Sequence, residues 1–185
     1  PRFIEVHRIG SFAARSLDID VVFDLMIHDL DIVQAVVGSE VESIEAVGVP
    51  VLTDHVDIAN VRLRFASGCL ANLTASRISR DRVRKLRFFQ RDAYISVDCA
   101  EQQTEAWRVS RTTESSPIID GGRLDVPVGE PLKYELVDFV RAVSRGVAPR
   151  VDGVAGRRAL ALAQRVAIEM QRDVDVFRRG SAGLE

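Results

Sequence analysis

The chain has 185 residues and 46% hydrophobic content, which is enough to bury one sizeable core, so a single domain over residues 1–185 is expected. A net charge of -2, from 25 Lys and Arg against 27 Asp and Glu, disfavours nucleic acid or a membrane surface as a partner. No apolar run approaches the roughly 20 residues that span a bilayer, and the first ten residues lack a secretion-signal layout, so we expect a cytoplasmic protein.

The first expected element is a short strand. Residues 3–9 alternate, with Ile4 and Val6 on one side and Glu5 and His7 on the other, which is the period of a half-buried strand.

A helix is expected over residues 21–37. Asp20 is a suitable N-cap, and Gly38 is a suitable stop. The residues that repeat at spacings of three and four are Val22, Leu25, Met26, Asp29, Val33 and Val36.

From residue 41 to about residue 112 the pattern changes to short runs of period two that are separated by turn residues. Ser67–Gly68 and Arg91–Asp92 are two of the expected turns. Connections this short leave no room for a crossover helix, so the sheet should be largely antiparallel. The clearest runs are 56–65, 84–90, 93–98 and 105–110.

After an irregular excursion expected over residues 115–130, the pattern becomes helical again. Pro131 suits the first position of a helix that ends before Gly146, and Asp152 can cap a last helix. The side chains expected to face the core are Leu132, Leu136, Phe139, Val140 and Val143 in the first of these helices and Leu160, Ala163, Ala167 and Met170 in the second. The expected fold is α+β, an open-faced sheet with its helices on one face.

Two kinds of cofactor site are missing from the sequence. There is no GxGxxG or Walker-type glycine loop, so this chain should not hold a dinucleotide by the usual geometry. Cys69 and Cys99 lack CxxC spacing and are expected to be buried thiols, and no metal site is expected.

Three titratable residues share one face of the 21–37 helix. Asp24, His28 and Asp31 stand four and three residues apart, which brings them to neighbouring points on a helix of about 3.6 residues per turn. A carboxylate beside an imidazole favours the charged ring and fixes which nitrogen holds the proton, so the pair suits acid/base chemistry. Two alternatives stay open at this stage: a histidine with a purely structural role, and a metal site formed by His28 with carboxylates.

The segment DLMIHDLD, from Asp24 to Asp31, resembles the DxGxHxxD signature of the Gfo/Idh/MocA oxidoreductases, with Met26 where glycine is usual. Residues 84–98 and 130–164 resemble two further motifs of that family in the same order. The resemblance implies the C-terminal, dihydrodipicolinate-reductase-like domain, with the N-terminal Rossmann domain absent from this chain.

The resemblance also implies a function. His28 would remove a hydroxyl proton as hydride leaves for a nicotinamide ring, and Asp24 would orient His28 or the substrate. NAD or NADP would bind mainly to the absent Rossmann domain, which also supplies a lysine from an EKP motif without a counterpart here. The chain alone is therefore expected to be inactive.

The run of residues 15–33 looks most like members that act on nucleotide sugars, among them UDP-N-acetylglucosamine 3-dehydrogenases. Candidate substrate-binding residues are His7, Arg8, Arg15 and Asp31, the alternative being an ordinary polar strand face. In this family the open face of the sheet commonly packs against another subunit, which implies a homodimer or tetramer. The competing hypothesis is a non-catalytic sugar-binding or oligomerisation module.

Overall fold

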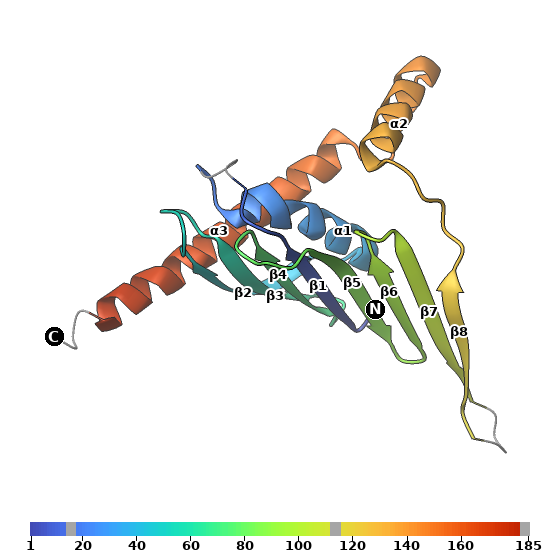
Figure 1. Cartoon of the computed structure of the whole chain (residues 1–185), viewed down its shortest axis with the longest axis horizontal. Helices are drawn as coiled ribbons and strands as arrows, with labels where there is room; N and C mark the ends of the chain where they lie inside the picture. Colours follow the sequence, from blue (N-terminus) through green and yellow to red (C-terminus); the bar gives the residue numbers. More distant parts are fainter. Residues whose placement is uncertain (14–17, 112–115, 182–185) are drawn as a thin grey trace.

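The computed structural model describes residues 1–13, 18–111 and 116–181, with only the helical backbone described for residues 173–181. Figure 1 shows one broad sheet with helices above it. The strands are β1 (Phe3–Ile9), β2 (Val41–Val49), β3 (Ile58–Phe65), β4 (Leu70–Ser76), β5 (Val83–Gln90), β6 (Ala93–Asp98), β7 (Gln103–Ser110) and β8 (Ile118–Leu124). The helices are η1 (Val22–Met26), α1 (Ile27–Val37), α2 (Pro131–Arg145) and α3 (Gly153–Ser181).

The strand order is β2-β3-β4-β1-β5-β6-β7-β8. The pairing of β1 with β4 is parallel, and the other pairings between described strands are antiparallel. A parallel neighbour is reached because the chain leaves β1 through a helix and two strands before it returns as β4. The expected α+β fold with a largely antiparallel sheet is confirmed.

The core lies between the sheet and helices α1 and α3. Alternate residues of β3 are buried, namely Ala59, Val61, Leu63 and Phe65, as the period-two pattern predicted. From α3, Ala163 and Met170 join that cluster, as expected. The opposite face of the sheet carries no helix in Figure 1.

Helix α2 departs from the expected packing. Its ends agree with the prediction, because Pro131 lies in the first turn and Gly146 has a left-handed φ of 62°. Its apolar side chains, however, are exposed, Phe139 by 59% and Val143 by 67%, and the helix stands away from the sheet in Figure 1.

Several local predictions are wrong. Residues 115–130 are not wholly irregular, because β8 pairs with β7. Asp20 does not cap the first helix with its side chain, since Asp20 Oδ1 accepts the N–H of Val56. Leu160 is 44% exposed, and Cys99 is exposed while Cys69 is buried as expected. No helix in the described ranges is both long and apolar enough to cross a membrane.

Candidate functional site

A buried ion pair ties the first helix to the central strand. Arg8 Nε and Nη2 donate to the two carboxylate oxygens of Asp29 over 2.6 and 2.7 Å. The two side chains are 13% and 3% exposed. Burial alone would lower the pKa of Arg8, but the hydrogen bond and the negative charge of Asp29 more than offset it, so the pKa is raised. A two-pronged bond of this kind holds α1 at a defined position over β1.

A second buried pair closes the end of β4. Arg77 Nε donates to Asp57 Oδ1 over 2.8 Å, and Arg77 Nη1 donates to the carbonyl of Ile19. Burial would raise the pKa of Asp57, but the backbone N–H groups of Val51, Leu52 and Thr53 and the Arg77 guanidinium hold it far below its usual range. This carboxylate therefore stays charged and fixes the loop that leads into β3.

Asp24 lies in a π-helical turn. The N–H of Ile27 bonds to the carbonyl of Val22, which is the five-residue spacing of a π-helix, before α1 continues in the ordinary geometry. π-helical turns are rare in proteins as a whole, and those that occur are often found at functional sites. The predicted helix over 21–37 is thus confirmed in extent, while its first turn is wider than expected.

A pocket of about 250 Å³ opens beside this turn. Arg8, Ile9 and Gly10 at the end of β1 line one side, and Asp24 and Leu25 of the π-helical turn line another. The end of β4 and the start of β5 complete the wall with Arg77, Arg82 and Arg84. The pocket forms at this edge because the carboxyl ends of the parallel strands β1 and β4 meet there.

The predicted site residues are only partly brought together. Asp24 and Arg8 line the same pocket. His28 is exposed on α1 outside the pocket lining, and among the described residues no hydrogen bond or ion pair joins it to Asp24. Asp31 is half-buried farther along α1 and pairs with no other described residue.

The remaining two candidates lie elsewhere. His7 follows Val6 on β1, so it points to the open face of the sheet, whereas Arg8 points to the helices. In the register of the sheet His7 stands between Thr74 and Lys85. Arg15 lies outside the described residues.

Arg77, Arg82 and Arg84 were not predicted as site residues from the sequence. A signal was present for Arg84, because it alternates with buried Leu86 and therefore shares the apolar face of β5. An arginine on the apolar face of a strand needs a charged or polar partner nearby. Arg82 carries no comparable signal, since it precedes the strand in an exposed turn.

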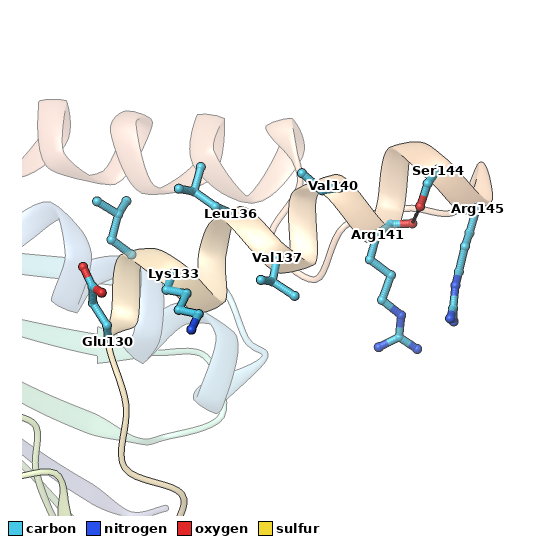
Figure 2. A pocket seen from close by; sticks show the side chains of 9 residues that line it. Glu130, Lys133, Leu136, Val137, Val140, Arg141, Ser144 and Arg145 are labelled. Atoms are coloured by element: carbon cyan, nitrogen blue, oxygen red, sulfur yellow. Dashed lines mark hydrogen bonds between the residues drawn. The ribbon is translucent and has the colours of Figure 1, made fainter.

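A larger groove of about 640 Å³ runs along α2 (Figure 2). Leu136 and Val140 project from one side of the helix, and Arg141 and Arg145 from the other. Leu132, Leu136, Val137 and Val140 give this groove an apolar stripe, which is typical of a surface that a neighbouring domain or subunit covers. Within the described ranges, no group of three His, Cys, Asp or Glu residues could hold a metal ion, there or at the arginine-lined pocket. The arginine-lined pocket is the better candidate for polar chemistry, because Asp24 of the first helix lines it together with four arginines.

Comparison with known proteins agrees with this architecture. A UDP-N-acetylglucosamine 3-dehydrogenase from Acidithiobacillus ferrooxidans is 38% identical over 172 residues, which cover 92% of this chain and 55% of that protein. Its solved structure superimposes with a TM-score of 0.83 at 37% identity, over 93% of this chain and 54% of the other. This chain therefore spans about half the length of these relatives.

Two more distant structures share the fold. A levoglucosan dehydrogenase in complex with NADH gives a TM-score of 0.74 at 13% identity, over 92% of this chain and 56% of the other. An oxidoreductase domain protein from Kribbella flavida gives 0.77 at 14% identity, over 93% and 56%. Residues 7–101 match the GFO/IDH/MocA C-terminal domain, which is just over half of the chain. The chain belongs to the GFO/IDH/MocA C-terminal domain family.

Proposed function

We propose that this chain is the substrate-side half of an NAD(P)-dependent dehydrogenase that oxidises a secondary hydroxyl of a nucleotide sugar, with UDP-N-acetylglucosamine as the leading candidate. The main support is that Asp24, which belongs to the DxxxH segment of the first helix, lines a pocket that four arginines also line. The 38% identical relative is named for a reaction on a UDP-sugar, which supports the same substrate class.

His28 is the proposed base. Oxidation of a secondary alcohol requires that the hydroxyl proton be removed, and an imidazole can accept it near neutral pH. His28 is exposed and one helical turn from Asp24, so a substrate seated over the pocket can reach both side chains. Asp24 is the proposed orienting residue, and it acts on the substrate in the pocket.

The residues of this chain do not fit a dinucleotide. Holding a pyrophosphate in the usual way needs a glycine-rich turn between a strand and a helix. The connection from β1 to η1 contains Gly10 as its sole glycine, and the whole sequence lacks GxGxxG. We therefore place the NAD or NADP site, and with it the acceptor of hydride, outside this chain, which leaves the chain inactive by itself.

The test uses the complete protein, with this chain joined to its nucleotide-binding half. Reduction of NAD or NADP in the presence of UDP-N-acetylglucosamine should be observed, and His28→Ala should lower kcat by about 100-fold or more, the usual contribution of a general base. His55→Ala is the matched control, because His55 lies on a loop outside the pocket lining and should leave kcat within about twofold. Unchanged turnover in His28→Ala would remove His28 from the mechanism.

We also propose that the open face of the sheet joins two copies of the chain. Phe3, Phe89, Tyr94 and Trp107 stand in register across β1, β5, β6 and β7. The first three form ring contacts with centroids 5.5 and 5.2 Å apart, and Trp107 is 39% exposed. Phe3, Phe89 and Tyr94 are half-buried beside it, and aromatic residues are enriched at protein interfaces. Light scattering should give a dimer or tetramer that Trp107→Glu weakens, and a monomeric wild-type protein at micromolar concentration would refute this assembly.

A further inference from the structure

Two arginines at the pocket differ from their neighbours, because no carboxylate of a described residue forms an ion pair with them. Arg8 is bonded to Asp29, and Arg77 is bonded to Asp57. Arg82 and Arg84 also line the pocket, and neither forms a hydrogen bond or an ion pair with another described residue through its side chain. Asp24 is the acidic residue of the lining, and no ion pair within the described ranges joins it to either arginine. The pocket therefore holds two guanidinium groups that are available to a ligand.

The position of Arg84 is unfavourable without an anion. Arg8 and Arg84 stand directly opposite each other in the antiparallel pair of β1 and β5, and both point to the helices. Like charges in directly opposed positions destabilise a sheet. Partial burial, followed by repulsion from Arg8 and Arg82, lowers the pKa of Arg84, while Asp29 opposes that shift. An anion between these side chains would relieve the repulsion.

We propose that Arg82 and Arg84 bind the diphosphate of the nucleotide-sugar substrate, an assignment that rests on the proposed function. A guanidinium offers two parallel N–H donors that match two phosphate oxygens, and a diphosphate bridge carries one negative charge on each phosphate group. Two unpaired arginines thus match the ligand in charge. A pocket of about 250 Å³ is smaller than the roughly 300–1,000 Å³ that encloses a drug-sized ligand, so it holds the diphosphate rather than the whole molecule.

This placement also orients the substrate. The diphosphate lies at the start of β5, and Asp24 of the first helix lines the same pocket, so the sugar attached to the diphosphate extends toward that helix. His28 is the next titratable residue along that exposed side of the helix. Arg82 and Arg84 are therefore specificity-determining residues, which select a nucleotide sugar over a free sugar.

The nicotinamide dinucleotide carries a diphosphate of the same chemistry, so the experiment must separate the two sources. We would titrate the 185-residue chain by calorimetry at low ionic strength with UDP-N-acetylglucosamine, UDP, N-acetylglucosamine and NADH in turn. The variants are Arg82→Gln and Arg84→Gln. Arg80→Gln is the matched control, because Arg80 is exposed in the same turn and does not line the pocket. Thermal unfolding of each variant checks that it is folded.

The proposal predicts that UDP and UDP-N-acetylglucosamine bind the wild-type chain and that Arg84→Gln weakens both by about tenfold or more, as for the loss of a charged hydrogen bond. Arg82→Gln should have a smaller effect in the same direction, and Arg80→Gln should stay within about twofold. Added salt should weaken UDP binding and leave N-acetylglucosamine unaffected.

Failure of UDP to bind the folded wild-type chain, or equal affinity in all three variants, would overturn the inference. NADH binding that depends on Arg84 more strongly than UDP binding would also overturn it, because the pocket would then serve the cofactor. The outcome is separable from that of the proposed function. Arginine-dependent UDP binding by this chain, together with a complete protein that does not oxidise UDP-N-acetylglucosamine, would refute the reaction and keep the diphosphate site.

Discussion

The ion pair between Arg8 and Asp29 should act as a unit, which single and double substitutions can test. The Asp29 side chain is 3% exposed and accepts two hydrogen bonds from Arg8. Its removal leaves the positive charge of the Arg8 guanidinium, which is only 13% exposed, without a bonded carboxylate. Breaking a buried pair in this way costs about 3–5 kcal/mol. Total stabilities of about 5–15 kcal/mol are usual, so Asp29→Leu should consume a large part of the stability of the chain.

The double variant Arg8→Met with Asp29→Leu should behave differently. It removes both charges and puts apolar side chains of similar length beside the existing core. Replacements of this kind range from neutral to stabilising by about 1–4 kcal/mol. The double variant should therefore recover most of the stability that either single variant loses, which gives a large coupling energy in a double-mutant cycle.

Urea unfolding, followed by circular dichroism, measures the free energy of unfolding of all four proteins of this cycle, and thermal unfolding measures their Tm. For a chain of this size, about 1 kcal/mol corresponds to about 2–4 °C in Tm, so Asp29→Leu should lower Tm by about 6–20 °C. A single variant that loses less than about 1 kcal/mol would show that the buried pair is not needed for stability. A double variant that loses the sum of the two single effects would show that Arg8 and Asp29 do not act as a unit.

Three further predictions concern other parts of the fold. Asp57→Asn should lower the free energy of unfolding by about 3–5 kcal/mol at pH 7. Because the pKa of Asp57 is depressed in the folded chain, the difference from wild type should shrink as the pH falls below about 4, and urea unfolding at about pH 7 and below about pH 4 checks this. Gly121→Ala should destabilise the pairing of β8 more than Gly122→Ala does. Both glycines have positive φ, but only a Cβ at position 121 would lie against the backbone of Ala106. Hydrogen exchange of the β8 amides compares the two variants, and equal protection in both would contradict this prediction. A thiol reagent should modify Cys99 alone in the folded chain and Cys69 as well in denaturant, because Cys69 is 1% exposed whereas Cys99 is exposed. Rapid reaction of both thiols in the folded chain would count against the packing described.

The elements with a clear period could be predicted from the sequence, and those without one could not. The alternation of apolar and polar residues located strand β3, and Gly38 located the end of helix α1. Both signals depend on local geometry, so neither needed knowledge of the fold. Strand β8 was missed because Gly121 and Gly122 are typical of a loop, and its pairing with β7 depends on an extended glycine backbone that fits closely against Ala106.

The candidate site was predicted in part for the same reason. Asp24 and His28 lie four residues apart in one segment, so their proximity on a helix follows from sequence spacing. The partner of Arg8 is 21 residues away and the partner of Arg77 is 20 residues away, and only the tertiary fold brings them together. Asp29 was placed on the apolar stripe of its helix, yet its buried bond to Arg8 depends on which residue of β1 lies beneath it.

We propose that a nucleotide sugar binds at the arginine-lined pocket with its sugar ring toward the first helix. A crystal structure of the complete protein with bound UDP-N-acetylglucosamine tests it most directly. We expect phosphate oxygens within hydrogen-bond distance of Arg82 and Arg84 and a sugar hydroxyl beside His28. A ligand bound along α2 or on the open face of the sheet, with the arginine-lined pocket empty, would contradict it.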